Sequence, residues 1–456
     1  MLISHRLARF ARELTLDRVP AAVRRRAKLL ILDALGIALA SSRFDFAAKA
    51  YAGLSRFGSG PIPVIGMGHA MALRDAAMMN GILVHGLDYD DTYLPGSVHM
   101  TASNVPCALA LGAEAHMSGA DFLAACIVGL ESGARIGRAG QGNFHKAGFH
   151  PTALCGAFSC ALLAGRLMAL DEQAIVRAQG VALSMASGSM QTLQDGTWTK
   201  RMHPGWAAAA GITAAGLASG GFTAPEASYE GRWGVYTLFL GALADQATPE
   251  LAIEQLGEDW QFVRSSIKLY PACHQSHAFM NAAIRLARAH AFAPEEVVGV
   301  HALVADITRD LVCEPLVVRQ RPDSSYLAQF SLPYAMAACL THRRFGLEQI
   351  RPEAYEDPAV LALAERFSYA IDPAAGFPKT RTGEVIVTLR DGRVLRERDE
   401  IDPDAPVGEA AIVEKFRANA GMTLEAARVD RLCQRILEVD REPDMAALAA
   451  ELGAAP

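Results

Sequence analysis

Hydrophobic residues recur with a helical period over most of the first 265 residues of this chain. Val23, Ala27, Leu30 and Ala34 fall on one stripe after Pro20, which suits the start of a helix. Segments rich in Ala, Leu and Met follow, and most glycines and prolines fall between them. This pattern predicts helices at residues 73–87, 103–117, 119–137, 150–168, 172–189 and 205–219.

The pattern changes after Pro271. A helix expected at residues 275–290 is followed by residues 296–304, whose branched side chains are typical of a strand. Later, two more strand-like runs flank Asp391-Gly392, a pair that fits a type I′ hairpin turn. A small sheet is therefore expected in this part of the chain.

These patterns predict a mainly α fold. Residues 1–267 are expected to form a large all-helical domain, and residues 268–402 a smaller α+β domain. Residues 403–456 are helical again and are expected to return to the helical domain. The 456 residues, of which 51% are hydrophobic and 20% charged, suffice for a large core and two domains.

Composition narrows the function class. A formal net charge of −6 argues against a nucleic-acid partner, which would normally require a basic surface. Eight cysteines without a CxxC pair argue against a disulfide framework or zinc cluster and favour a cytoplasmic location. No targeting segment and no uninterrupted apolar run of about 18 residues is evident, so no membrane span is expected.

Three carboxylates stand close together at Asp88, Asp90 and Asp91, and a loop then leads to His99. Like charges so close repel each other, so some need cationic or hydrogen-bonding partners. The cluster is either part of a functional site or a solvated loop or helix cap. No metal site is predicted, because the Gly and Glu that an EF-hand needs at later offsets are absent.

Two further segments carry ionisable groups between helices. His150 precedes a proline that can open a helix, and the positive end of the helix dipole favours its neutral, basic form. Lys200, Arg201 and His203 lie in a polar stretch, read as a loop, before a helix opened by Gly205, which suits carboxylate binding. The alternatives are a structural histidine and a surface loop.

The fourth segment lies at the expected domain junction, where ligands often bind, and contains Tyr270, Cys273, His274 and His277. Cys273 is more typical of a packed thiol than of a nucleophile, because no convincing base partner accompanies it. The two histidines could share a helix face, and one or both could be structural.

Taken in order, these segments resemble the MmgE/PrpD family, which includes 2-methylcitrate dehydratase, cis-aconitate decarboxylase and iminodisuccinate epimerase. The resemblance covers nearly the whole chain. It rests on Leu-Asp-Ala-Leu-Gly at residues 32–36, Asp-Tyr-Asp-Asp-Thr at 88–92, Gly-Phe-His-Pro-Thr at 148–152, Thr199-Lys200 with His-Pro-Gly at 203–205, Lys268-x-Tyr270-Pro271, and Leu-Pro-Tyr-Ala at 332–335.

The resemblance implies a helical domain completed by the tail, a lid domain over a cleft, a homodimer and no required cofactor. In the decarboxylase branch, the functional positions resemble Asp88, Thr92, His99, His150 and Lys200, with one more residue from the Tyr-Pro segment. Two departures stand out. The loop before His99 is one residue longer and lacks a His-Pro pair, and Cys273 stands nearest the decarboxylase histidine.

The expected function is a 2-methylcitrate dehydratase-like lyase that acts beside a carboxylate of a small di- or tricarboxylic acid by general acid–base catalysis without a cofactor. An epimerase, a cis-aconitate decarboxylase and a non-catalytic binding protein are the alternatives. The sequence leaves open the substrate and which histidine is acid or base. The predicted catalytic residues are Asp88, Thr92, His99, His150, Lys200 and His277, and the predicted substrate-binding residues are Arg201, His203, Tyr270, Cys273 and His274.

Overall fold

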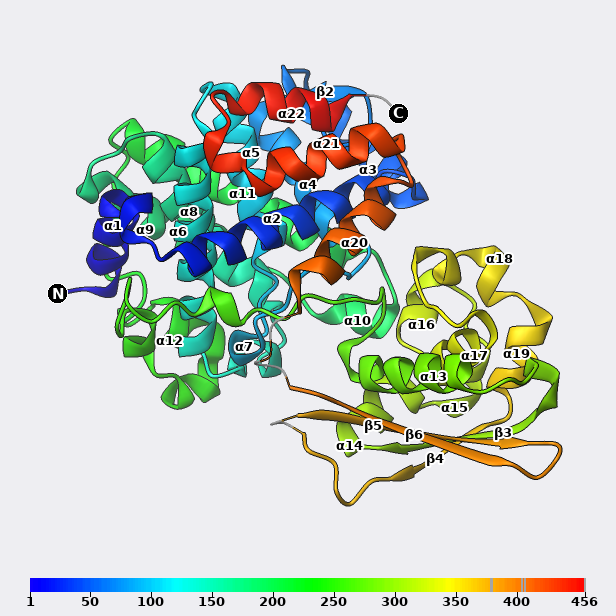
Figure 1. Ribbon diagram of the computed structural model, residues 1–456. Coiled ribbons are helices and arrows are strands. Elements are labelled where there is room, and N and C mark those ends of the chain that lie inside the picture. Colours follow the sequence, from blue (N-terminus) through cyan, green and yellow to red (C-terminus); the bar gives the residue numbers. More distant parts are fainter. Residues whose placement is uncertain (378–379, 403–404, 406, 455–456) are drawn as a thin grey trace. The chain divides into compact units, whose positions relative to one another are not determined.

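The computed structural model describes residues 1–377, 380–402, 405 and 407–454 (Figure 1). The chain forms two compact units: unit 1 comprises Met1–Ile267 and Val407–Pro456, and unit 2 comprises Lys268–Pro406. Residues 403 and 404, at the predicted end of the α+β domain, lie outside the described residues. The mainly α fold with a small α+β part is confirmed.

Unit 1 is almost entirely helical. Its helices α8 and α11 pack against each other, with α4, α5, α6 and α9 around them. The elements are α1 (Ile3–Glu13), α2 (Ala21–Ser41), α3 (Asp45–Leu54), β1 (Ile62–Val64), β2 (His69–Met71), α4 (Leu73–His85), α5 (Thr101–Glu114), α6 (Gly119–Ala139), α7 (Asn143–Lys146), α8 (Pro151–Leu167), α9 (Glu172–Met185), α10 (Gln191–Asp195), α11 (Thr199–Ser219), α12 (Val235–Leu240), α20 (Glu409–Ala420), α21 (Ala426–Leu437) and α22 (Met445–Gly453).

Two glycines set the crossing of α4 and α11. A Cβ atom on Gly81 would lie 2.5 Å from the Cα atom of Gly205, and one on Gly205 would lie 2.2 Å from the carbonyl oxygen of Met78. The two backbones therefore touch without intervening side chains. This contact brings the end of α4 close to the beginning of α11, where the polar residues of both segments lie.

The C-terminal helices belong to unit 1. Helix α20 packs along α2 (Figure 1), and α22 packs on α5 and β1 by their contacts. Gly36 of α2 admits the ring of Phe416, because a Cβ atom at this position would lie 2.8 Å from the Phe416 Cδ2 atom. The Leu-Asp-Ala-Leu-Gly motif at residues 32–36 is thus where the tail packs.

Unit 2 is built on a four-stranded sheet of order β4-β3-β5-β6, in which β3 and β4 are parallel and the other pairs antiparallel. Helix α13 packs on β5 and β6 and against α17. The elements are α13 (His277–Ala289), β3 (Val297–Val304), α14 (Asp306–Thr308), α15 (Leu316–Gln320), α16 (Ser325–Gln329), α17 (Leu332–His342), α18 (Pro352–Tyr355), α19 (Pro358–Ala364), β4 (Phe367–Ile371), β5 (Arg381–Leu389) and β6 (Val394–Ile401).

The β5–β6 hairpin lies where the sequence places it, but its predicted turn type is wrong. Gly392 has a φ of +88°, whereas Asp391 is not among the residues with positive φ, as a type I′ turn requires. The Gly392 N–H donates to the Leu389 carbonyl, and Leu389 N–H donates to Arg393. The loop is therefore a three-residue turn closed by a left-handed glycine.

Among the described residues, no helix is both long and apolar enough to cross a membrane.

Candidate active site

The site in unit 1 is built where α4 ends. His85 is the last residue of α4, and the chain then turns through Asp88, whose φ of +48° is left-handed. The acidic segment, defined here as residues 88–92, follows, and within it Asp90 and Asp91 are buried. Because this segment is folded inward, it is not the solvated loop that was the alternative interpretation.

His85 and Asp90 form a buried pair. The Nδ1 atom of His85 lies 2.8 Å from Oδ2 of Asp90, and both side chains are fully buried. The same carboxylate oxygen lies 3.6 Å from Nδ1 of His99. Asp90 therefore orients the ring of His85 and lies close to that of His99, and a proton on Nδ1 of His85 leaves its Nε2 as an acceptor.

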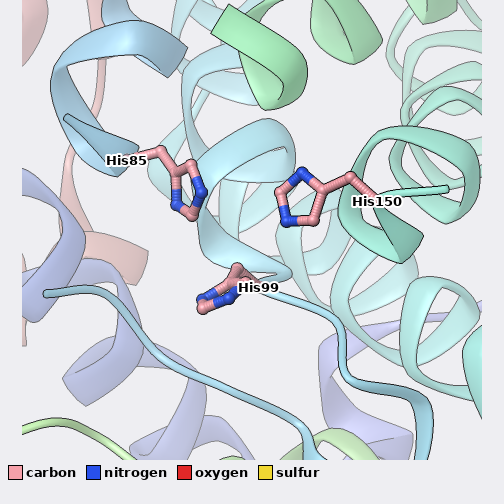
Figure 2. Close-up of side chains that lie close together, drawn as sticks. All are labelled: His85, His99 and His150. Atoms are coloured by element: carbon pink, nitrogen blue, oxygen red, sulfur yellow. The ribbon is translucent and has the colours of Figure 1, made fainter. Parts of the chain in front are cut away.

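Three imidazoles converge on one space. Figure 2 shows the rings of His85, His99 and His150 turned toward one another. The His85 ring centroid lies 4.8 Å from that of His99 and 5.4 Å from that of His150. Within the described part of the chain, Nε2 of His85 and Nε2 of His150 are buried without a hydrogen-bond partner. These two nitrogens can therefore serve a ligand.

His150 is the N-cap residue of α8, ahead of Pro151, as its sequence position suggests. Its Nδ1 atom lies 3.1 Å from Nδ1 of His203. Burial, followed by the charge of Lys200, holds the pKa of His150 well below its usual value. Burial also lowers the pKa of His203, to about 4. Two neutral rings that share one Nδ1 proton must be opposite tautomers, so only one of them has a bare Nε2.

Lys200 supplies the cation of the site. Its Nζ atom lies 3.0 Å from Oδ2 of Asp88, and both side chains are largely buried. The predicted loop around it is wrong, because α11 begins at Thr199 and places Lys200 and His203 in its first two turns. Arg201 stacks on the rings of Phe46 and Trp198, beside an apolar cavity of about 440 Å³.

Thr92 and Asp91 join the acidic segment to its surroundings. The Oγ1 atom of Thr92 lies 3.4 Å from Nδ1 of His99, and its backbone pairs with Ser266. Asp91 accepts from the N–H and the hydroxyl of Thr101 at the start of α5. Burial raises the pKa of Asp91 to about 6, and its hydrogen bonds tie the acidic segment to the start of α5.

The predicted residues of the Tyr-Pro segment cluster within unit 2. The rings of His274 and His277 are 4.8 Å apart, and Nε2 of His277 lies 3.1 Å from the carbonyl oxygen of Ala272. The Tyr270 hydroxyl donates to Asn281 over 2.7 Å. The backbone N–H of Cys273, the fourth predicted residue, donates to the Gln329 carbonyl.

A buried arginine near this segment was not predicted. Arg381 is 8% exposed, and its Nε and Nη1 atoms have no hydrogen-bond partner in the described ranges. Burial lowers its pKa, an effect opposed by the neighbouring Cys273. A buried guanidinium with unpaired N–H groups is costly, so an anionic ligand would stabilise it.

The histidines offer donors for a metal ion. Single nitrogens of His85, His99 and His150 lie within 4.8 Å of one another, and a second such group consists of His85, Asp88, Asp90 and His99. In a tetrahedral zinc site, with Zn–N bonds of about 2.1 Å, ligand nitrogens are only about 3.4 Å apart. The limit of 4.8 Å is wider than this spacing, so zinc would require the three nitrogens to lie well inside it.

The sequence analysis missed His85 and Asp90 as site residues. Asp90 stands in the same motif as Asp88 and His85 shortly precedes it, but nothing in the spacing shows which of these side chains point inward. The signal that could have found them is a histidine at the end of a predicted helix with an aspartate five residues later, because such residues can pair across a turn.

A buried histidine cluster beside one lysine–aspartate pair suits acid–base chemistry on an anionic ligand.

Comparison with known proteins shows that the chain belongs to the MmgE/PrpD family, as the motifs predict. The model of the MmgE/PrpD N-terminal domain matches residues 5–246, and that of the C-terminal domain matches residues 270–439. The latter match extends into the tail helices that pack in unit 1.

Its relatives include three proteins with related names. A cis-aconitate decarboxylase of Aspergillus terreus is 29% identical over 98% of this chain and 95% of its own length. A cis-aconitate decarboxylase-like protein of Aspergillus oryzae is 25% identical over 98% of this chain and 96% of its own. The human cis-aconitate decarboxylase is 28% identical over 83% of this chain and 79% of its own length.

Proposed function

We propose that this chain is a lyase that acts on a small polycarboxylate by general acid–base chemistry, and specifically a carboxy-lyase for a cis-aconitate-like tricarboxylate. The observation that carries the proposal is the buried cluster of His85, His99 and His150 beside the Lys200–Asp88 pair. Relatives that match nearly the whole chain and are named cis-aconitate decarboxylases support the reaction type.

The reaction needs a cation and an acid. In an unsaturated tricarboxylate, the bond to one carboxylate breaks, CO₂ leaves, and its electron pair forms a new C=C bond. The displaced alkene pair then takes one proton at the far carbon. Negative charge develops beside carboxylates that are already charged, so a fixed cation and a positioned acid lower the barrier most.

The cluster supplies both. Lys200 is the cation that would hold a carboxylate, with Asp88 fixing its ammonium. His99, whose side chain is 10% exposed, is more open than His85 and is placed to meet substrate. His150 is the second candidate, since its Nε2 is buried without a partner among the described residues. The acid is whichever of the two carries its proton on the nitrogen facing the ligand.

Arg381 gives unit 2 a buried cation of its own. Its Nε and Nη1 atoms are buried without partners among the described residues, so their N–H groups can donate to an anionic ligand. We assign it a carboxylate-binding role, which the sequence analysis did not include.

A hydro-lyase of the 2-methylcitrate dehydratase type is the second function. The low pKa of His150 favours it, because a neutral imidazole is the base that an α-proton abstraction needs. Cys273 also separates this chain from the decarboxylase branch, because it stands nearest the position at which those enzymes have a histidine. An epimerase would use the same cluster with bases on both faces of one carbon.

Proton NMR in deuterated buffer separates these functions. The purified protein is incubated with cis-aconitate, 2-methylcitrate, citrate and iminodisuccinate in turn. Loss of the cis-aconitate alkene proton with growth of two signals from a terminal =CH₂ group supports the carboxy-lyase. A new alkene from 2-methylcitrate supports the hydro-lyase, and deuterium exchange with unchanged connectivity supports the epimerase. No change in any of the four substrates would contradict the proposed function.

Variants connect the activity to the site. Lys200→Met and His150→Gln are each expected to slow the observed change about 10²-fold or more. Lys146→Met is the matched control, because Lys146 bonds to Asn143 in α7 and lies outside the cluster. Full turnover by both site variants would show that the activity resides elsewhere.

A further inference from the structure

The motif at residues 32–36 contains a buried aspartate, Asp33, that has no role in the proposed chemistry. Asp33 is 1% exposed in α2, and its Oδ1 atom lies 2.7 Å from Nζ of Lys415 in α20. Lys415 is itself 5% exposed. An ion pair buried this deeply costs much desolvation and adds little net stability, so its contribution lies in fixing which groups meet.

The same ammonium reaches the acidic segment. Nζ of Lys415 donates to the backbone carbonyl of Tyr89 over 2.8 Å and lies 3.8 Å from the centroid of the Tyr89 ring. Tyr89 stands between Asp88, which pairs with Lys200, and Asp90, which pairs with His85. One side chain of the tail is thereby bonded both to α2 and to the middle of the acidic segment.

The acidic segment needs such a restraint. Asp88 has a left-handed φ of +48°, a conformation that non-glycine residues seldom adopt without support. Displacement of Tyr89 would move both neighbouring carboxylates, and with them the partners Lys200 and His85.

We propose that Lys415 is a positioning residue of the active site, which holds the acidic segment in place by tying Tyr89 to Asp33 of α2. Its effect on turnover rests on the proposed function, whereas its effect on the order of the segment does not. The tail helix α20 is then part of the catalytic apparatus although it carries no residue of the histidine cluster.

The test replaces the charged pair by a neutral one. Lys415→Met alone would leave Asp33 buried and unpaired, so the main variant combines Lys415→Met with Asp33→Asn. The matched control is Lys28→Met with Asp440→Asn, another lysine–aspartate pair between α2 and the tail, 2.5 Å apart. That pair makes no hydrogen bond to the acidic segment in the described structure.

Two readouts are compared, both well below the melting temperature. Amide hydrogen exchange in residues 86–99 is expected to be about tenfold faster in the main variant, as for loss of one hydrogen bond from a charged group. The kcat is expected to fall about 10²-fold, as for a misplacement near 1 Å. The control should match wild type in both. Lys415→Arg keeps a positive charge beside Asp33 but changes the donor to Tyr89, so exchange should rise in this variant as well.

Exchange and kcat equal to those of the control in every Lys415 variant would overturn the proposal. If wild-type protein turns over no polycarboxylate, the proposed function fails, and the exchange measurement alone decides the role of Lys415.

Discussion

Substitution of Asp91 by asparagine should stabilise the protein in a pH-dependent way. Both hydrogen bonds from Thr101 go to Oδ1 of Asp91, at 3.1 Å from N and 2.6 Å from Oγ1. An asparagine carbonyl can accept them in the same place. Its amide would replace Oδ2, which is buried and without a partner among the described residues. The change therefore removes a buried charge and leaves the helix contact intact.

The magnitude follows from the pKa of Asp91, which burial raises from 3.8 to about 6. Because the folded pKa is the higher one, the stabilisation from this carboxyl is complete below pH 3.8 and is lost as pH rises through 6. The free energy of unfolding falls by about 3 kcal/mol in total by pH 8, and about half of this fall has already occurred at pH 5. Relative to wild type, Asp91→Asn should gain about 1–2 kcal/mol between pH 5 and pH 8.

Urea unfolding followed by circular dichroism at several pH values from 5 to 8 measures this difference. Asp17→Asn is the control: a hydrogen bond from Thr15 lowers the pKa of Asp17, so its titration lies below this pH range. The free energy of unfolding of the control should differ from that of wild type by the same amount at pH 5 and at pH 8. A difference between Asp91→Asn and wild type that is the same at pH 5 and pH 8 would refute the reasoning.

Four further predictions follow from the site and the fold. Lys200→Met should lower kcat/KM about 10²–10³-fold in steady-state assays. Gly205→Ala should destabilise by about 1–3 kcal/mol because its methyl group would meet a carbonyl 2.2 Å away, whereas Gly216→Ala in the same helix meets nothing within 4 Å and should not, as thermal melts can show. Arg381→Gln should raise KM for a tricarboxylate about tenfold or more with kcat retained. Tricarboxylate binding near pH 7 should take up protons, seen by titration calorimetry in buffers of different ionisation enthalpy; equal heats would contradict it.

Much of the fold could be predicted because periodicity reports local structure directly. Residues 119–137 and 150–168 were predicted as helices, and α6 and α8 span Gly119–Ala139 and Pro151–Leu167. The start of α11 was missed because a proline usually ends a predicted helix. Pro204 instead lies in the second turn, where it removes only the backbone bond to the Lys200 carbonyl.

The site could be predicted only in part, because spacing shows which residues are chemically able but not which meet. The structure brings Asp88, His99, His150 and Lys200 into one neighbourhood, and their roles stay predictions. Their meeting depends on the backbone contact between Gly81 and Gly205, which no hydrophobic pattern reveals. For the same reason, the sequence did not show that the side chain of Arg201 stacks on an aromatic ring.

The electrostatics of the cluster explain how neutral histidines could supply an acid. Burial and the nearby ammonium of Lys200 both lower the pKa of His150, so the empty site favours uncharged imidazole. A bound polycarboxylate would reverse the second influence, because its negative charges would neutralise the ammonium and favour imidazolium. A proton would then enter the site together with its substrate, where the reacting carbon needs it. In that case Lys200 has two roles: it holds the carboxylate, and it couples protonation of the histidine to substrate binding.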